Sequence, residues 1–358
     1  MSKEREIRVN TSPAYTVSIG PGLLGTCDRR LAEIIPPACH IAVVTDSAVG
    51  PLYLEKVKES LAAAGYVVCA YTFPAGEGSK NFTTLSAILE FLAAEHLTRT
   101  DCLIALGGGV VGDMAGFAAA CYLRGIRYVQ MPTTLLSAVD SSVGGKTAID
   151  LSAGKNLAGA FLQPAAVLCD TDCLKSLPPD IFADGAAEAV KTAVLSDPRL
   201  FNCVESGMLN ALDPVEMIAG CVAYKAGVVE RDEKETGERK LLNLGHTIGH
   251  AIEKCSGYTI PHGHAVAAGL AVISRSAARL GWMPDSRDAD RICAALADLS
   301  LPVSTEFSPE LLADAALADK KRAGDFITIV VPKEIGGCEL RKMPVTELLP
   351  VIRAGWEA

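Results

Sequence analysis

Short apolar runs alternate with amphipathic segments over residues 40–170. Longer segments with the composition of helices, such as PLYLEKVKESLAAAG (51–65) and NFTTLSAILEFLAAEH (81–96), separate the apolar runs. Such alternation predicts βαβ units around a parallel sheet whose strands are buried on both faces. We expect a Rossmann-like α/β domain with strands in HIAVVTD (40–46), YVVCAYTF (66–73), DCLIALGGG (101–109), RYVQMPT (127–133) and AAVLCD (165–170).

The pattern changes after the double proline of LKSLPPD (174–180). Long segments rich in Ala, Leu and Glu follow, such as AAEAVKTAVL and HAVAAGLAVISRSAARLG, and FITIVVP (326–332) is the one late strand candidate. At 358 residues the chain also exceeds what one hydrophobic core usually supports. We therefore expect an α/β domain over residues 1–177 and a mainly helical domain over residues 178–358.

Composition and charge narrow the function classes. A net charge of −9 disfavours nucleic acid as a ligand, because nucleic-acid-binding proteins concentrate positive charge on one face. The N-terminal MSKEREIRVN lacks the apolar core of a signal peptide, and no uncharged apolar run reaches the roughly 18 residues that a membrane span needs. The sequence predicts a cytoplasmic protein whose partners include neither nucleic acid nor a membrane.

The 12 cysteines stand singly, without CxxC pairs, and several lie in apolar runs. This usage predicts reduced thiols in the core. A thiol nucleophile or a zinc site built from cysteines is the less favoured alternative.

The stretch LGGGVVGDMAGF places Gly107, Gly108, Gly109 and Gly112 between a predicted strand and a predicted helix. Glycine there permits a positive φ and a close approach of backbone amides to a phosphate, and the helix dipole favours an anion. The spacing is not GxGxxG, so a tight turn without a ligand is the alternative to a dinucleotide site. Asp46, at the end of its strand, suits either a ribose hydroxyl or a helix cap.

The stretch DSSVGGKTAIDLSAGKN is predicted to be a loop, because glycines interrupt it. It lacks the spacing of a P-loop, so Walker chemistry is rejected. Its Asp140, Lys146, Lys155 and Asn156, with Arg124 upstream, suit a phosphorylated, polyhydroxylated anion. Solvated loop charge is the alternative, and the charged run that carries Lys225, Glu235, Arg239 and Asn243 is open to the same interpretation.

Four of the six histidines lie between positions 246 and 264. His246 and His250 share a face if a helix begins near Gly245, and His262, between Pro and Gly, is expected on a loop. Two histidines and one carboxylate would leave an open coordination position, as catalytic zinc requires. Glu188 and Lys191, three apart on a predicted helix, are an ordinary surface ion pair in the alternative interpretation.

Many local motifs together resemble the 3-dehydroquinate synthase family over nearly the whole chain. They are GEGSK, GGGVVGDMAGF, MPTTLLSAVDSSVGGKTAID, GKNLAGAF, GAAEAVK, KAGVVERDE, LLNLGHTIGHAIE, PHGHAVAAGL and ADKK. The resemblance implies an NAD-binding α/β domain followed by a helical metal-binding domain, in agreement with the pattern above.

The resemblance also implies roles for individual residues. Metal ligands would be Glu188, His246 and His262, and catalytic residues would be His250, Glu235, Lys146, Lys191 and Asn156. Substrate would be held by Arg124, Asp140, Lys146, Asn156, Lys191, Lys225, Arg239, Asn243 and Lys320. NAD would be held by Asp46, Glu77, Lys80, Gly108, Gly109, Val110, Asp113, Thr133, Thr134 and Lys155.

One position departs from the family pattern. The family commonly reads HGEAV where this chain reads HGHAV, so His264 stands in place of a glutamate. His264 is either a substitute partner for a ligand or a tolerated neighbour, and it is the fallback if His262 is not a ligand.

The reaction that the resemblance implies converts 3-deoxy-D-arabino-heptulosonate 7-phosphate to 3-dehydroquinate and phosphate in the shikimate pathway. NAD would be reduced and restored within one turnover, and zinc, with cobalt as an alternative metal, would polarise the substrate oxygens. Family members are often homodimers. The alternatives are another sugar-phosphate cyclase, a metal-dependent polyol dehydrogenase, and a non-catalytic sensor that binds NAD and metal.

Overall fold

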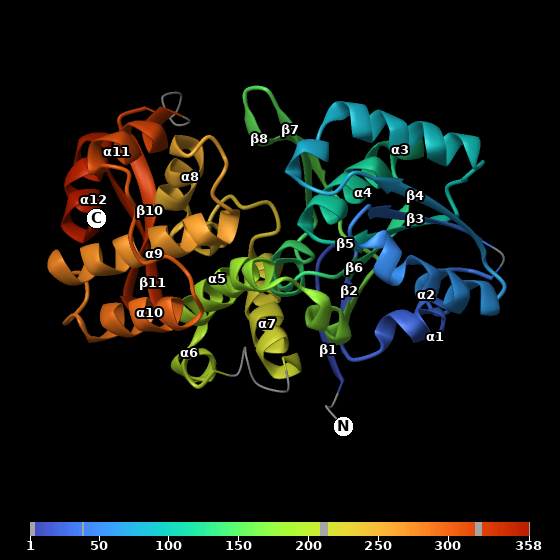
Figure 1. Cartoon of the computed structure of the whole chain (residues 1–358), viewed down its shortest axis with the longest axis horizontal. Helices are drawn as coiled ribbons and strands as arrows, with labels where there is room; N and C mark the ends of the chain where they lie inside the picture. The colour runs from blue at the N-terminus through green and yellow to red at the C-terminus, as the bar shows by residue number, and fades with distance from the viewer. Residues whose placement is uncertain (1–3, 38, 208–213, 319–323, 358) are drawn as a thin grey trace. The chain divides into compact units, whose positions relative to one another are not determined.

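The computed structural model describes residues 4–37, 39–207, 214–318 and 324–357. The chain divides into two compact units (Figure 1). Unit 1 comprises residues 1–177 with residues 225–234, and unit 2 comprises residues 178–224 and 235–358. Unit 2 thus begins at Pro178, while the end of helix α7 (Val215–Arg231) groups with unit 1.

Unit 1 is built on a seven-stranded sheet, counted over the described residues. The strand order is β1 (Arg5–Val9), β2 (Tyr15–Gly20), β9 (Ala166–Asp170), β6 (Arg127–Pro132), β5 (Cys102–Gly107), β3 (His40–Asp46) and β4 (Val67–Phe73). Neighbouring strands are parallel except β1 and β2, which pair antiparallel. The predicted Rossmann-like sheet is confirmed, whereas the β1–β2 hairpin was not predicted.

Helices cover both faces of this sheet, as the apolar strands require. On one face Ile104 of β5 packs in a core with α1 (Cys27–Leu31) and α2 (Gly50–Ala63). On the other face Leu103 packs with α3 (Phe82–Ala94) and α4 (Gly109–Cys121). Full burial of each such side chain contributes about 1.5–3 kcal/mol.

The stretch after Gly145 was expected to be a loop, and this expectation is wrong. Residues Lys146–Leu151 and Gly154–Phe161 form an antiparallel hairpin, β7 and β8. Positive φ angles at Gly144, Gly145 and Gly154 supply the bend before the hairpin and the turn inside it.

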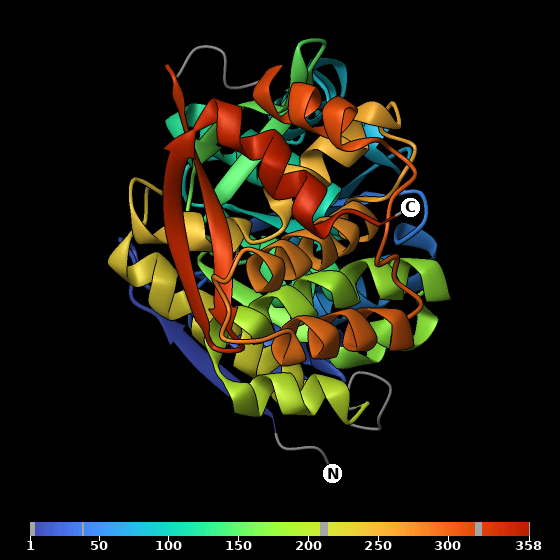
Figure 2. The same cartoon turned by 90° about the vertical axis from the view of Figure 1, so that its left-hand side faces the viewer.

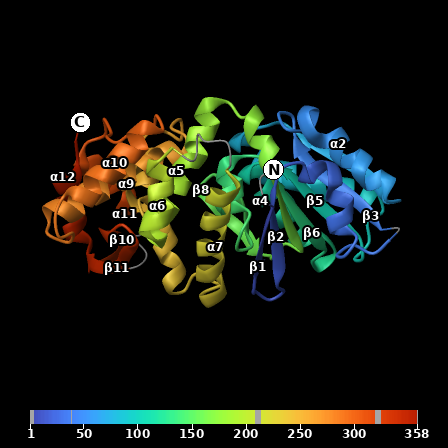
Figure 3. The same cartoon turned by 90° about the horizontal axis from the view of Figure 1, so that it is seen from below.

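Unit 2 is mainly helical, as predicted. Its helices are α5 (Pro179–Ser196), α6 (Pro198–Glu205), the first part of α7, α8 (His246–Cys255), α9 (His262–Arg279), α10 (Arg287–Asp298), α11 (Pro309–Ala318) and α12 (Leu348–Gly355). The predicted strand is β10 (Phe326–Glu334), which pairs with β11 (Gly337–Pro344). Figures 2 and 3 show this hairpin beside α9 and α12. Within the described ranges, every helix is too short or too polar to cross a membrane.

Helix α9 is the central element of unit 2. Its residues from Ala265 to Ser274 are buried on all sides, because α5, α8, α10 and α12 all pack against it. A helix with apolar residues all round is stable only when neighbours cover every face. The core of the unit therefore fixes the axis of α9, and His262 is the first residue of this helix.

Candidate functional site

Three helices of unit 2 bring one carboxylate and two imidazoles together. Glu188 lies in the middle of α5, while His246 and His262 are the first residues of α8 and α9. The Nε2 atoms of His246 and His262 lie 3.5 Å and 3.4 Å from Oε1 of Glu188, and one donor atom from each residue lies within 4.8 Å of the others. The donor set suits zinc or cobalt and leaves a coordination position for another ligand.

Glycines allow these helices to approach closely. A Cβ atom on Gly269 of α9 would lie 2.3 Å from the carbonyl oxygen of Gly245, at the start of α8. A Cβ atom on Gly263 would lie 1.9 Å from the carbonyl oxygen of Asp184 on α5. Larger residues would force the backbones apart. Helix α9 thus lies against both neighbours, and its start lies against α5, which places His262 within reach of the acid on α5.

Both histidine rings are oriented by a second contact. Nδ1 of His246 lies 3.1 Å from the carbonyl oxygen of Leu244, so Nδ1 donates to it and Nε2 faces Glu188. Nδ1 of His262 lies 3.3 Å from Oε2 of Glu253, a buried acid on α8. Partners of this kind fix the tautomer and the orientation of metal-binding imidazoles.

The two rings differ in their electrostatics when no metal is bound. Burial lowers the pKa of His246 to about 3. Burial also opposes protonation of His262, but its contacts with Glu188 and Glu253 outweigh this effect and raise its pKa to about 10. At neutral pH the metal-free group therefore holds one neutral and one protonated imidazole.

Lys191 completes the buried part of the site. Its Nζ atom lies 2.5 Å from Oε2 of Glu188, and both side chains are at most 2% exposed. The alternative of a surface ion pair is therefore wrong. A buried carboxylate is costly without nearby positive charge, and the ammonium of Lys191 supplies that charge at Glu188.

His250 lies one turn after His246 on the same face of α8, as predicted, and its side chain is exposed. The ring centroids of these two residues are 5.3 Å apart. His250 also forms a second group of possible metal ligands with Glu253 and His262. Sequence reasoning missed Glu253, although its position three residues after His250 and seven after His246 places it on the same helix face.

The structure corrects the expected loop at His262 and places His264 apart from the possible metal ligands. His262 is the first residue of α9 rather than part of a loop. His264, the fallback ligand, belongs to neither group of possible ligands in the described chain. Its Nδ1 atom lies 3.2 Å from Oδ1 of Asp184 instead.

Three more residues expected to act in unit 2, Glu235, Arg239 and Asn243, lie just before α8. Nδ2 of Asn243 donates to Oε1 of Glu235 over 2.9 Å, and Arg239 is 1% exposed. Glu235 has a left-handed backbone with φ 58°, as do Arg124 and Asn156 of unit 1 with φ 69° and 57°. Such strained conformations cluster at functional sites. Lys320 lies outside the described residues.

In unit 1, the glycine turn joins β5 to α4 as predicted, but for a different reason. None of Gly107, Gly108, Gly109 and Gly112 has a positive φ. They are required by close approach: a Cβ atom on Gly107 would lie 2.5 Å from Val111 Cγ2. Because the N-terminus of α4 has no capping side chain, the amides of its first turn, including that of Val110, present a partial positive charge.

A lysine links three elements next to this turn. Nζ of Lys80 lies 2.6 Å from Oδ2 of Asp113 on α4, 2.5 Å from Oδ1 of Asn156 on β8 and 3.9 Å from Oε1 of Glu77. Burial opposes protonation of Lys80, but the acids outweigh it and raise its pKa. Burial raises the pKa of Asp113 and of Glu77. Four residues expected from the resemblance thus meet through direct contacts.

Most of the further expected residues of unit 1 follow the carboxyl end of β6, whereas Arg124 precedes β6 and therefore lies at the amino ends of the strands. The ammonium of Lys225 bonds the side chain of Asp140 and lies 2.9 Å from its carbonyl oxygen. Thr133 and Thr134 directly follow β6, and Gly107 accepts a hydrogen bond from the Thr133 amide. Lys146 and Lys155 lie on β7 and β8, and Arg124 follows α4.

Asp46 holds the turn that precedes α2, although no side chain caps that helix directly. Its Oδ1 accepts from the amides of Ala48 and Val49, both over 2.9 Å, where α2 begins. A role in binding NAD is therefore left to Oδ2 of this residue, and that role stays a prediction.

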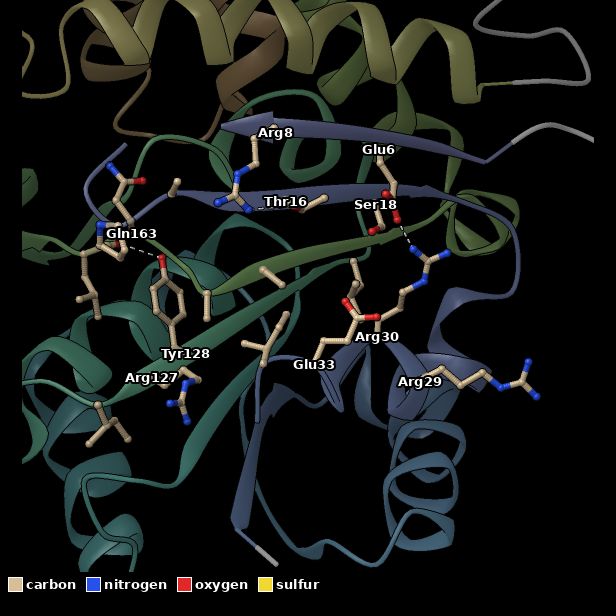
Figure 4. Close-up of a pocket in the computed structure, with 18 residues that line it drawn as sticks. Glu6, Arg8, Thr16, Ser18, Arg29, Arg30, Glu33, Arg127, Tyr128 and Gln163 are labelled. Carbon is tan, nitrogen blue, oxygen red and sulfur yellow. Dashed lines mark hydrogen bonds and ion pairs between the residues drawn. The ribbon is translucent and has the colours of Figure 1, made fainter. Parts of the chain in front are cut away.

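A separate groove of about 970 Å³ contains none of the expected site residues (Figure 4). It lies over one face of β1, β2 and β9, where Glu6 pairs with Ser18 and Arg8 with Thr16 across β1 and β2. Helix α1 contributes Arg30 to the same groove.

The chain matches family models and curated proteins over most of its length. Residues 70–184 match the N-terminal model and residues 185–322 the C-terminal model of 3-dehydroquinate synthase. A 3-dehydroquinate synthase of Caulobacter vibrioides is 46% identical over 342 residues, which cover 92% of each chain.

Two solved structures are similar in fold at 26% identity. One is a 2-deoxy-scyllo-inosose synthase complexed with carbaglucose-6-phosphate, NAD+ and Co2+, with a TM-score of 0.86. The match covers 99% of this chain and 100% of the synthase chain. A 2-epi-5-epi-valiolone synthase from Streptomyces hygroscopicus with NAD+ and Zn2+ bound also has a TM-score of 0.86 and covers 99% of this chain and 98% of its own.

Proposed function

The chain belongs to the 3-dehydroquinate synthase family, and we propose that it converts 3-deoxy-D-arabino-heptulosonate 7-phosphate to 3-dehydroquinate and phosphate. The observation that carries this proposal is the group of Glu188, His246 and His262, which the fold brings together within a chain that matches the family over both domains. The enzyme would be a carbon–oxygen lyase that depends on NAD and a divalent metal.

We propose that Glu188, His246 and His262 hold the metal. The buried carboxylate and the two oriented rings fit zinc or cobalt, as argued above. A divalent cation there supplies Lewis-acid chemistry, because it polarises the oxygen atoms of the substrate. Lys191 balances the charge of Glu188 and presents its ammonium beside the metal position.

We propose that unit 1 holds NAD at the start of α4. Amides of the first turn would bind the pyrophosphate, and the contacts of Lys80 with Asp113 and Asn156 support the surrounding elements. NAD supplies a hydride acceptor and, later in the turnover, a hydride donor. The other NAD-binding residues that the resemblance implies would contact the rest of the cofactor.

The charged side chains of the protein would bind and orient the substrate. Lysines and arginines neutralise a phosphate and a carboxylate in a protein that is acidic overall. His250, exposed next to the ring of His246, is the candidate to take the proton of the oxidised alcohol. Glu235, held by Asn243, is a second candidate for proton transfer.

Phosphate release tests the proposed reaction. The purified protein, loaded with zinc, is mixed with the heptulosonate phosphate and catalytic NAD, and phosphate, 3-dehydroquinate and reduced nicotinamide are followed. Many phosphates released for each NAD, without accumulation of NADH, support the synthase. Accumulating NADH supports a polyol dehydrogenase, turnover only on other sugar phosphates supports a different cyclase, and binding without turnover supports a sensor.

We also propose that the protein forms a homodimer in the cytoplasm. The groove over β1, β2 and β9 is the candidate contact surface between two copies, because residues of both charges line it, among them Arg8 and Glu33. A self-associating surface must be complementary to itself. The free state of all 12 cysteines is consistent with a reducing compartment.

The mass in solution tests the dimer. Light scattering should give twice the chain mass of 37.5 kDa, and Arg8→Glu should shift the protein toward the single-chain mass. Lys58→Glu, a charge reversal on α2 outside the groove, is the matched control. A single-chain mass for the wild type would contradict the dimer.

A further inference from the structure

We propose that Asp184 and His264 are positioning residues that fix the first turn of α9 and thereby aim His262 at the metal position. This inference rests on the metal centre proposed above. Neither residue belongs to the proposed set of metal ligands, and both lie within unit 2.

The start of α9 lacks a cap from its own sequence. The residue before the helix is Pro261, whose side chain has no hydrogen-bond acceptor, and no side chain caps the helix from that position. Asp184 on α5 supplies the missing acceptor, because its Oδ1 atom accepts from the backbone amide of His264 over 3.1 Å. His264 is the third residue of the helix, whose amide a capping side chain normally binds.

The same carboxylate also binds the His264 side chain. Nδ1 of His264 lies 3.2 Å from Oδ1 of Asp184, and the two side chains are 22% and 17% exposed. The acid therefore holds both the backbone and the ring of one residue. A carboxylate at the N-terminus of a helix is also favoured by the helix dipole.

The contact has a direct geometrical link to the metal group. Asp184 and Glu188 are four residues apart on α5 and therefore share a face. Asp184 contacts His264 while Glu188 Oε1 lies 3.4 Å from Nε2 of His262, so two acids one turn apart contact two histidines of one helical turn. Loss of the contact between Asp184 and His264 would allow the first turn of α9 to fray and His262 to leave Glu188.

The contact with Asp184 also explains why the residue at position 264 is a hydrogen-bond donor. A glutamate, the residue common in the family at this position, would place a second carboxylate against Asp184. The two like charges would repel at this short distance. Histidine instead offers the N–H that the acid accepts.

Zinc affinity of the metal-free protein tests the inference. Asp184→Ala and His264→Ala should each lower zinc affinity about tenfold or more, and His264→Asn, whose amide nitrogen can replace Nδ1, should stay near the wild type. His264→Glu should be the weakest single variant, and adding Asp184→Ala to it should restore part of the affinity. Glu205→Ala, which breaks an ion pair between α6 and α10, is the control.

A second measurement separates positioning from general stability. The visible spectrum of the Co2+-loaded protein reports the ligand geometry, so it should change in Asp184→Ala and stay unchanged in His264→Asn and Glu205→Ala. Wild-type zinc affinity and an unchanged spectrum in Asp184→Ala would overturn the inference. If that variant does not fold, equal affinities of His264→Glu and His264→Asn would overturn it. A wild type that binds no zinc would overturn the metal centre itself, and this inference with it.

Discussion

Nδ1 of His262 lies 3.3 Å from Oε2 of Glu253, an acid that is only 3% exposed. The other nitrogen of the same ring faces Glu188, so one imidazole lies between two buried carboxylates from two different helices. A ring held at both nitrogens has one orientation, and the acid at Nδ1 increases the basicity of Nε2.

Zinc affinity should therefore depend on Glu253. Glu253→Gln keeps an acceptor for Nδ1 but removes the charge, whereas Glu253→Leu removes both. We expect zinc affinity to fall about tenfold or more in the leucine variant, with the glutamine variant between it and the wild type. Competition with a chelating dye measures the affinity. Equal affinities of all three proteins would show that Glu253 does not orient His262.

Replacement of Glu188 should affect both metal binding and stability. Glu188→Ala removes a ligand and also removes the carboxylate 2.5 Å from the buried ammonium of Lys191. Breaking a buried pair in this way costs about 3–5 kcal/mol of unfolding free energy. The double variant Glu188→Ala with Lys191→Met should regain most of this stability in urea unfolding while still binding no zinc. Wild-type zinc affinity in either protein would contradict the ligand assignment.

Metal uptake should release a proton. The pKa of His262 is raised to about 10, so this ring is protonated at pH 7 in the metal-free protein, whereas the pKa of His246 is lowered to about 3 and that ring is already neutral. A metal binds only the neutral form, so binding displaces the proton of His262 and affinity rises with pH up to about 10. Calorimetry in two buffers of different ionisation enthalpy should give about one proton per zinc. No proton release would show that His262 is neutral before binding.

His250 should be needed for turnover but not for the metal. Its ring neighbours that of His246, but its side chain is exposed and lies outside the group around Glu188. His250→Ala should therefore keep the zinc content of the wild type and slow phosphate release by about 100-fold or more, as loss of a proton-transfer group does. Loss of zinc from this variant would instead make His250 a ligand.

The strong periodicity of apolar and polar residues made much of the fold predictable from the sequence. The runs at 41–44 and 102–106 are apolar at every position because helices cover both faces of the sheet. The β7–β8 hairpin and β11 were missed because their exposed faces carry charged and small residues that read as loop. A strand with one solvated face gives a weaker signal than a buried one.

The candidate site was only partly visible in the sequence. The spacing of His246 and His250 predicts their common helix face, but nothing local to Glu188 reveals that α5 lies against α9. That contact depends on Gly263, whose role appears only once two distant backbones are seen together. The partner of His264 was equally hidden, because Asp184 is 80 residues away in the chain.

Anomalous scattering at the zinc edge, from crystals of the zinc-loaded protein, locates the metal independently of any assumed ligand. The proposed metal centre predicts one peak at about 2.0–2.2 Å from a carboxylate oxygen of Glu188 and from Nε2 of both His246 and His262. A peak within bonding distance of His250 and Glu253 instead, or no peak at the three predicted ligands, would contradict it.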